Sequence, residues 1–211
     1  MKVLNNHRFS NLLEDIGEAF NHIEELHHPL TVPHEHAVGK YMYAFAKHLN
    51  MGEEKAQSLG FAGKLHDIGK IKIAGSILDQ AGPLDSPQRK KMEEHSEIGY
   101  HILNMIDHPL LQLSAILALH HHENFDGSGY PKGLKGDEIP FECRICSICD
   151  VYDALRRRRS YKESLSHQET VDLMVNQAKG GMAHKFDPEL LEEFEKSHHL
   201  FEKIALEIAQ T

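Results

Sequence analysis

The sequence predicts an all-α fold that encloses a metal centre. Apolar residues recur at helical spacing through most of the 211 residues, and no segment shows the alternation of apolar and polar residues that is typical of a strand. The chain also contains 18 histidines, and histidine is the commonest metal ligand in proteins. Several of them fall at expected helix ends beside loops, where side chains from different helices can meet.

The composition excludes several classes of protein. Apolar residues make up 40% and charged residues 26% of the chain, which is enough to bury a core. No run of eighteen apolar residues is present, and the polar N-terminal segment lacks the apolar core of a signal peptide. We therefore expect a cytoplasmic protein with no membrane partner. The net charge of −9 argues against binding to duplex nucleic acid, which usually requires a basic surface.

The first three expected helices follow from apolar spacing. Residues 12–26 form a short amphipathic segment. Residues 34–50 form a longer one, with apolar side chains at helical spacing at Val38, Tyr41, Met42, Phe45 and Leu49. Residues 53–67 form the third helix, and we expect Gly69 to end it, because glycine adopts the backbone conformation that terminates many helices.

Prolines and cap residues mark the remaining helices. Ser86 followed by Pro87 is typical of a helix start and predicts a helix to about residue 106. Prolines at 109 and 140 open helices to about residues 122 and 155. Ser166 and Glu169 form a capping-box pattern before a helix that is expected to stop at the glycine pair 180–181. A last, long helix starts at residues 187–188, an Asp-Pro pair.

Two long irregular segments lie between these helices, at residues 70–85 and 124–139. Both are rich in glycine, proline and aspartate, and long loops of this kind are usually functional or disordered. We expect a single domain over residues 31–211, preceded by an N-terminal helical extension over residues 1–30.

The three cysteines are expected to be core residues. Cys143, Cys146 and Cys149 resemble an iron–sulfur spacing, but such clusters normally need four thiolates. Their spacing of three also places them along one side of a helix, as small buried residues. An odd number of cysteines suits a reducing compartment.

Seven histidine and aspartate side chains form the candidate metal site. They lie near helix ends or loops on five expected helices: His34, His66, Asp67, His95, His121, His122 and Asp150. Each taken alone is explained as well by a surface or hydrogen-bonded side chain. The adjacent pairs at 66–67 and 121–122 differ, because neighbours on a helix lie about 100° apart and can reach one metal. Mixed histidine and carboxylate ligands suit Fe, Mn, Zn or Ni, and seven ligands favour two ions over one.

The motifs around these residues resemble those of the HD-GYP phosphodiesterases, a branch of the HD phosphohydrolases. HDIGK at residues 66–70 contains the name-giving HD motif, and HHENFDGSGYPKGLKGDEIP at residues 121–140 matches the downstream signature almost position for position. Segments 34–38, 95–103, 149–155 and 186–190 are similar to four further family segments. The resemblance covers about residues 34–191 and implies an HD-domain helical bundle with a buried metal centre.

The resemblance also implies a role for each candidate residue. The seven histidines and aspartates would be metal ligands, with Asp67 as the bridge between the ions. Asp67 and Lys70 are the expected catalytic residues, and Lys70 would contact a non-bridging phosphate oxygen. Substrate contacts are expected from Lys70, Asp126, Gly127, Gly129, Tyr130, Arg159 and Lys162.

The implied reaction is hydrolysis of cyclic di-GMP to linear pGpG, with further cleavage to GMP in some family members. Two cations lower the pKa of a bridging water, and the resulting hydroxide attacks phosphorus in line with the ribose 3′ oxygen. Family members with three metals carry a glutamate where this chain has Leu30. We therefore expect two divalent ions, iron foremost, with manganese, zinc or nickel as alternatives, and pGpG as the main product.

One segment departs from the family pattern. DALRRRRSYK at residues 153–162 stands where the family often has Asp-Ala-Leu-Thr-Ser-Asp-Arg-Pro-Tyr-Arg. Arg159 and Lys162 keep positive charge where the family contacts phosphate, whereas Arg156, Arg157 and Arg158 are unusual and fit a solvated basic turn equally well. The segment leaves open an HD-type phosphohydrolase that acts on another cyclic dinucleotide or nucleotide. A non-catalytic signalling module is a third hypothesis.

Other features of the sequence stay open as well. The histidines at 36, 120 and 184 are expected to have supporting or surface roles, and Glu35 is not counted as a ligand because it points elsewhere on its helix. Three arrangements of the whole protein are compatible with the sequence: a stand-alone enzyme, a homodimer built through the N-terminal helix, or a piece of a longer protein.

Overall fold

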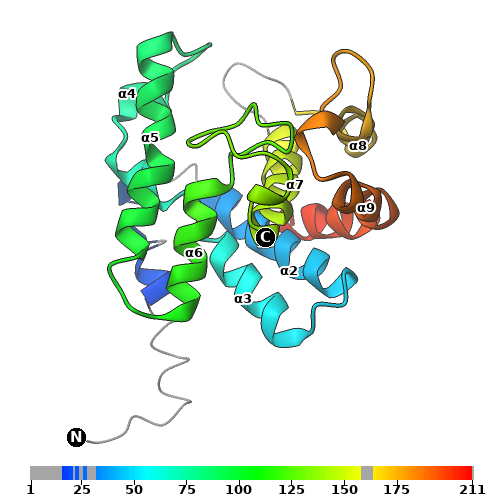
Figure 1. The fold of residues 1–211 in the computed structure, drawn as a ribbon, viewed down its shortest axis with the longest axis horizontal. Coiled ribbons are helices and arrows are strands. Elements are labelled where there is room, and N and C mark those ends of the chain that lie inside the picture. The colour runs from blue at the N-terminus through cyan, green and yellow to red at the C-terminus, as the bar shows by residue number, and fades with distance from the viewer. Residues whose placement is uncertain (1–15, 21, 24–25, 28–31, 158–163, 211) are drawn as a thin grey trace, which may run out of the picture.

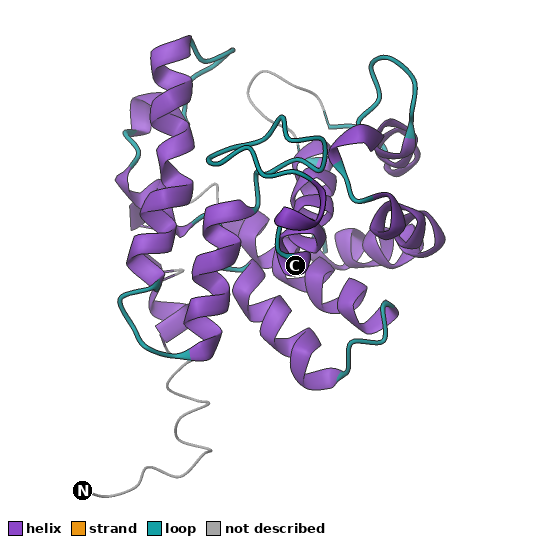
Figure 2. Cartoon of the chain, viewed as in Figure 1, coloured by secondary structure: helices purple, strands orange, loops and turns teal. Residues whose placement is uncertain are grey.

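The computed structural model describes residues 16–20, 22–23, 26–27, 32–157 and 164–210. Among these residues there is no strand, and helices form the whole framework (Figures 1 and 2). The α-helices are α2 (Val32–His48), α3 (Glu53–Gly63), α4 (Gly75–Leu78), α5 (Ser86–Leu103), α6 (Pro109–His120), α7 (Phe141–Arg156), α8 (His167–Val175) and α9 (Pro188–Ile208). Three short 3-10 helices are η1 (Ile68–Lys72), η2 (Gly136–Glu138) and η3 (Ala183–Lys185). The predicted all-α fold is confirmed.

The largest apolar cluster joins the helices at the two ends of the chain. Side chains of α2, α3, α7, α8 and α9 pack together in it. Tyr41 of α2 stacks on Phe201 of α9, with ring centroids 5.1 Å apart, and Tyr152 of α7 meets both rings edge-on. These large rings are fully buried, so they fix α2 and α7, two of the helices that carry candidate ligands, against α9.

A second, smaller cluster lies between α5 and α6. It contains Leu65, Ile68, Leu103, Leu111, Ala115 and Ala118. The described parts of the N-terminal segment are helical, and Phe20 from that segment packs against this cluster. The remainder of the expected N-terminal extension lies outside the described residues.

Two helix starts have the cap residues that the sequence predicts, and a third has a different one. Ser166 and Glu169 form the predicted capping box of α8, and Asp187 caps α9 by accepting from two backbone N–H groups. In α5 the cap is Asp85 rather than Ser86, because the Asp85 carboxylate accepts from the backbone N–H of Gln88 while the Gln88 side chain accepts in return.

The prediction for the end of the third helix is wrong. α3 stops at Gly63, and residues 64–67 form tight turns in which the N–H groups of Lys64 and Leu65 bond three residues back. Gly69 therefore does not end a helix but lies inside η1. A Cβ atom there would lie 1.9 Å from the carbonyl oxygen of His95, so glycine is required for η1 to pack against α5.

The end of α8 and the irregular segments also differ from expectation. α8 stops at Val175 rather than at the glycine pair 180–181, because Asn176 adopts an extended backbone conformation. The segment at 70–85 contains the end of η1 and the short helix α4, and the loop at 124–139 contains η2.

The three cysteines behave as predicted. Cys143, Cys146 and Cys149 are free thiols with no exposed surface, within the larger apolar cluster. Burial raises the pKa of each thiol, so all three stay protonated core residues.

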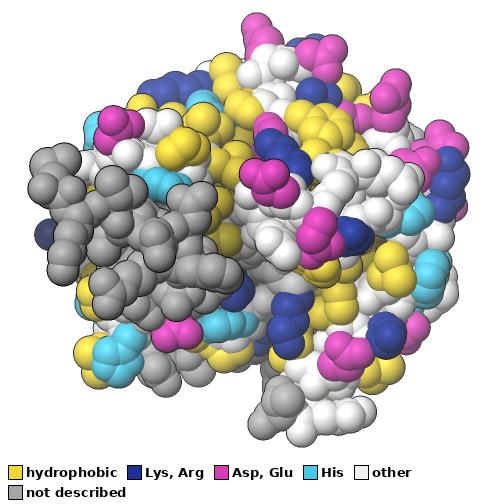
Figure 3. Space-filling model, turned by 90° about the horizontal axis from the view of Figure 1, so that it is seen from below, with side chains coloured by type: hydrophobic (Ala, Val, Ile, Leu, Met, Phe, Trp, Pro, Cys, Tyr) yellow, Lys and Arg dark blue, Asp and Glu magenta, His cyan; other side chains and the backbone are white. Residues whose placement is uncertain are grey.

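The surface carries mixed charge on the side shown in Figure 3, where acidic and basic side chains alternate with apolar ones instead of forming a basic patch. This mixture agrees with the net charge of −9. In the part of the chain that the structure describes, no helix combines the length and the apolar character needed to cross a membrane.

Candidate metal centre

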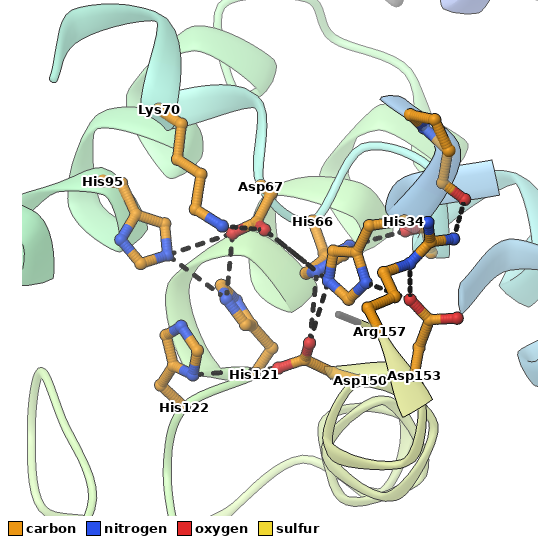
Figure 4. A network of polar contacts seen from close by, with 12 residues as sticks. His34, His66, Asp67, Lys70, His95, His121, His122, Asp150, Asp153 and Arg157 are labelled. Carbon is orange, nitrogen blue, oxygen red and sulfur yellow. Dashed lines mark hydrogen bonds and ion pairs between the residues drawn. The ribbon is translucent and has the colours of Figure 1, made fainter. Parts of the chain in front are cut away.

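The structure brings all seven predicted ligands together (Figure 4). α2 supplies His34, α5 supplies His95 and α7 supplies Asp150. The remaining four lie in the turns that directly follow α3 and α6. Donor atoms that lie within 4.8 Å of one another form two groups. The first group is Asp67, His95, His121 and His122, and the second is His34, His66 and Asp67. Both groups share Asp67.

The two oxygens of Asp67 face the two groups separately. Its Oδ1 lies 3.2 Å from His95 Nε2 and 3.6 Å from His121 Nε2. Its Oδ2 lies 3.4 Å from His66 Nε2 and 3.9 Å from His34 Nε2. The Asp67 carboxylate is almost fully buried and lies between the two groups.

Asp150 closes the gap between the groups from the side of α7. Its Oδ1 lies 3.0 Å from His34 Nε2 and its Oδ2 lies 3.9 Å from His122 Nδ1. One carboxylate thus contacts a histidine of each group.

The sequence predicted that His66 and Asp67 lie on a helix, but in the structure they lie in a turn. The turn lets His66 Nδ1 donate to the carbonyl oxygen of Gly63, 2.7 Å away. The opposite nitrogen, Nε2, is buried and has no hydrogen-bond partner. A buried nitrogen lone pair without a partner is costly unless a cation or a donor meets it.

His95 and His121 present the same geometry. The Nδ1 of His95 lies 2.6 Å from the carbonyl oxygen of Met92, and that of His121 lies 3.0 Å from the carbonyl oxygen of Ala118. With both Nδ1 protons directed at carbonyls, the two Nε2 atoms face each other as lone pairs at 3.3 Å. Because these lone pairs repel, the arrangement fits a metal ion that both nitrogens ligate.

The electrostatics agree with a ligand role. Burial lowers the pKa of His66 to about 4 and also lowers those of His95 and His122, so these imidazoles are neutral near pH 7. Burial alone would raise the pKa of Asp67, but the charges of Lys70 and the histidines hold it well below its usual range. The carboxylate is therefore ionised and the three imidazole lone pairs are free for a metal.

His34 differs from the other histidines because carboxylates flank both of its nitrogens. Burial opposes its imidazolium form, but hydrogen bonds to Asp150 and Asp153 outweigh burial and raise the pKa of His34 to about 9. Its Nδ1 lies 2.7 Å from Asp153 Oδ2. A carboxylate behind a histidine fixes the ring and increases its basicity as a ligand.

Lys70 extends from η1 toward the same carboxylate. Its ammonium group forms an ion pair with Asp67 Oδ2 and is largely buried. Burial alone would lower the pKa of Lys70, but Asp67, Asp150 and Glu35 raise it, so the lysine stays charged. Glu35, which the sequence interpretation set aside, is fully buried and contributes to this charge balance.

Comparison with known proteins agrees with this geometry. A family model described as the HD domain matches residues 9–190. The chain belongs to the HD domain family. It is 39% identical over 162 residues to the 3′3′-cGAMP-specific phosphodiesterase 2 of Vibrio cholerae, covering 77% of this chain and 30% of that protein. It is 36% identical over 188 residues to the cyclic di-GMP phosphodiesterase of Thermotoga maritima, covering 89% of this chain and 50% of that protein.

A solved structure shares the fold of this HD domain. Bd1817, described as an HDG"Y"P protein from Bdellovibrio bacteriovorus, matches with a TM-score of 0.60 at 18% identity, covering 77% of this chain and 50% of that one. The chain spans half or less of the length of the two curated relatives that it matches. The predicted HD-GYP membership is confirmed.

The loop of this HD domain that carries the GYP sequence folds back onto the predicted ligands. Tyr130 lies beside His122, with ring centroids 4.7 Å apart. Gly129 allows a close approach, since a Cβ atom there would lie 2.3 Å from the backbone nitrogen of Asn124. Gly127 has a φ of 85°, which favours glycine. Asp126 Oδ1 accepts from the backbone N–H of Ser128 and so shapes the same turn.

Two buried carboxylates of the HD domain were missed by sequence reasoning. Asp153 supports His34, and its spacing of three from Asp150 on one helix could have indicated it. Glu123 accepts from the backbone N–H groups of Lys132 at 2.8 Å and Leu134 at 2.9 Å, and so ties down the loop. Glu123 stands inside the matched signature that begins at residue 121, and this position could have indicated it.

The described residues include only part of the basic segment. Arg159 and Lys162, two predicted substrate contacts, lie outside the described residues, as does Arg158. Arg156 donates to the carbonyl oxygen of Leu165 at 2.9 Å. Arg157 contacts Asp153 and the carbonyl oxygen of Pro33. These two arginines have defined partners, so they are not simply a solvated turn.

Proposed function

We propose that this HD domain is a metal-dependent phosphodiesterase that hydrolyses cyclic di-GMP to linear pGpG. The observation that carries the proposal is Asp67, whose two oxygens face two separate groups of histidines beside the charged Lys70. A carboxylate placed in this way suits a bridge between two cations, and paired cations suit the attack on a phosphate ester.

The proposed cofactors are two divalent transition-metal ions. Five imidazoles with two carboxylates form a donor set for Fe, Mn, Zn or Ni, whereas Mg and Ca prefer oxygen ligands alone. Iron is our first choice, with manganese, zinc or nickel as alternatives. His95, His121 and His122 would hold one ion, His34 and His66 would hold the other, and Asp67 would contact both. Asp150 would complete the set from α7.

The chain's own residues would position the substrate and the charges. When bound, two metal ions supply Lewis acidity, which lowers the pKa of coordinated water and offsets negative charge on phosphate. Lys70, charged near neutral pH, would donate to a non-bridging phosphate oxygen, where charge builds in the transition state. Tyr130, whose hydroxyl stays protonated because burial raises its pKa, would shield the side of the centre near His122 from water.

A second substrate has direct support from the comparisons. The Vibrio cholerae relative, at 39% identity, is named for 3′3′-cGAMP, whereas the Thermotoga maritima relative is named for cyclic di-GMP. Both are cyclic dinucleotides with two 3′,5′-phosphodiester bonds, so the same metal centre could attack either. We retain 3′3′-cGAMP as the alternative substrate, and the basic residues Arg159 and Lys162 as proposed phosphate contacts.

One experiment separates these possibilities. Metal-free protein is loaded with Fe(II) or Mn(II), incubated with each cyclic dinucleotide, and the products are separated by chromatography. We expect pGpG from cyclic di-GMP, and no activity from Asp67→Ala, which would also lose metal. Intact cyclic di-GMP with every metal would overturn the proposal. Turnover of 3′3′-cGAMP alone would show that 3′3′-cGAMP, and not cyclic di-GMP, is the substrate. An Asp67→Ala protein with full metal content would refute the site assignment.

The cytoplasmic location, the boundary between residues 1–30 and 31–211, and the homodimer through the N-terminal helix stay predictions. The substrate roles of Asp126, Gly127 and Gly129 also stay predictions, although all three shape the loop that holds Tyr130.

A further inference from the structure

Arg157 connects two helices beside the metal centre. It is the C-terminal cap residue of α7, and its backbone N–H bonds to the carbonyl oxygen of Asp153 at 3.0 Å. Its guanidinium donates from Nε to the Asp153 carboxylate and from Nη2 to the carbonyl oxygen of Pro33, 2.5 Å away on α2 (Figure 4). The side chain is 30% exposed, so protein covers most of it.

Both partners of this guanidinium adjoin His34. Pro33 precedes it in the chain, so the bonded carbonyl belongs to the peptide unit that leads into His34. The Oδ2 atom of Asp153 that meets Arg157 is the same atom that lies 2.7 Å from His34 Nδ1. Arg157 therefore holds the backbone on one side of His34 and the carboxylate that orients its ring.

The two contacts require the shape of arginine. The guanidinium is a flat fork with several N–H donors at fixed angles, and it can meet a carboxylate and a carbonyl at once. A lysine would keep the charge but offers one nitrogen. Asp153 is only 3% exposed, so without Arg157 water replaces the lost donor poorly and the carboxylate would shift. The His34 ring would then lose its fixed orientation.

We propose that Arg157 is a positioning residue for His34, and through it for the ion held by His34, His66 and Asp67. The inference rests on the proposed metal centre. It assigns a role to one of the arginines that separate this chain from the family pattern. The second ion, beside His95 and His121, would share only the carboxylates of Asp67 and Asp150 with His34, and none of its histidines contacts Arg157 or Asp153. The effect of Arg157 is therefore expected to be larger at the ion that His34 would hold.

Arg156 provides a matched control. It is the neighbouring arginine at the end of the same helix, but its guanidinium donates to the carbonyl oxygen of Leu165, toward α8. Replacing it removes one positive charge and one backbone contact, as replacing Arg157 does, but leaves Asp153 and Pro33 in place.

The test is a calorimetric titration of metal-free protein with Mn(II), using wild type, Arg157→Gln, Arg157→Lys and Arg156→Gln. We expect two sites in wild type. In Arg157→Gln one site should weaken about tenfold, in the range measured for residues that orient metal ligands, and the other should change much less. Arg157→Lys should recover part of the loss, and Arg156→Gln should match wild type.

Several results would overturn the role of Arg157. They are two unchanged sites in Arg157→Gln, an equal loss at both sites, and an equal loss in Arg156→Gln. If circular dichroism shows that Arg157→Gln does not fold, the test uses Arg157→Lys instead. Wild-type Mn(II) affinity at both sites of Arg157→Lys would show that the guanidinium is not needed. A wild-type chain without two Mn(II) sites would instead overturn the proposed centre itself.

Discussion

Three histidines of the metal centre are held in one repeated way. The Nδ1 atoms of His66, His95 and His121 each bond to a backbone carbonyl three residues earlier, at 2.7, 2.6 and 3.0 Å. The bond fixes the ring tautomer and leaves Nε2 aimed at Asp67. Residue identity alone does not specify this orientation, because it depends on where each local turn places its carbonyl.

Lys70 offers a residue-level prediction. Lys70→Ala should lower kcat about a hundredfold, since the donor to the phosphate oxygen is lost where charge builds in the transition state. Metal content should stay near wild type, because the lysine is no ligand and its loss removes a positive charge beside the cations. Steady-state kinetics and metal analysis of one preparation measure both. Loss of metal together with activity would contradict this role and make Lys70 a structural support of Asp67.

At the residue scale the sequence identified the side chains that the structure brings together better than the residues that support them. The seven proposed ligands could be named because adjacent pairs and family motifs mark them, and the structure places them together. Asp153 and Glu123 were missed because their partners, His34 and the backbone of residues 132 and 134, lie far away in sequence or offer no side-chain signal. Substrate contacts from the basic segment lie outside the described residues and remain untested.

At the scale of elements, the loop of residues 124–139 depends on Glu123. This buried carboxylate accepts from two backbone N–H groups of the loop, and a glutamine can accept through only one of its two terminal atoms. We expect Glu123→Gln to lower kcat/KM for cyclic di-GMP about tenfold, since one unsatisfied buried group costs about 1–3 kcal/mol locally. Metal content, measured alongside, should not change.

Glu97 gives the control for this loop prediction. It pairs with the Lys132 ammonium at 2.8 Å, but both side chains are about half exposed, and exposed ion pairs contribute little. Glu97→Gln should therefore leave kcat/KM near wild type. Equal losses in both variants would show that the loop responds to charge on its surface and not to the Glu123 carboxylate.

A histidine network joins α7, α8 and α9 and predicts a dependence of stability on pH. His167 lies 2.8 Å from the Tyr152 hydroxyl and 2.8 Å from His198 Nδ1, and Glu202 and Arg156 also face it. Burial lowers its pKa in the folded state. The unfolded chain then binds a proton at His167 more readily than the folded chain does. The contribution of neutral His167 to the stability of the fold is therefore present above about pH 6.5 and is lost as the pH falls below it.

The variant His167→Gln isolates this contribution. Its melting temperature should fall less than that of wild type between pH 7.5 and pH 5.5, because glutamine does not titrate. Thermal unfolding in matched buffers measures both slopes, and the histidines outside this network cancel in the comparison. Parallel slopes for the two proteins would contradict the prediction.

The helix ends show what sequence patterns resolve at this scale. Starts at α8 and α9 were predicted because their caps are local and act within three residues. The end of α3 was not, because the tight turn of residues 64–67 and the approach of Gly69 to α5 are tertiary features. A glycine in the sequence can mark the end of a helix or a place where two backbones pack closely, and only the tertiary structure distinguishes the two.

At the scale of the whole molecule, the metal centre joins the two apolar clusters. His34 and Asp150 come from α2 and α7 of the larger cluster. His95 comes from α5 of the smaller cluster, and His121 directly follows α6. Asp67 lies in the turn between them. Metal bound at this junction should therefore stabilise the fold as well as serve the reaction.

Removal of metal gives the last prediction. A ligand at a hundred times its Kd stabilises a protein by about 2.7 kcal/mol, which for a chain of this size raises the melting temperature by about 5 to 10 °C. We expect a chelator to lower the melting temperature by this amount and Mn(II) to restore it after the chelator is removed. Asp67→Ala should melt at one temperature with or without Mn(II), because its bridge is missing. A chelator-insensitive wild type would mean that the clusters hold together without the ions, and that the histidine lone pairs are satisfied by other means.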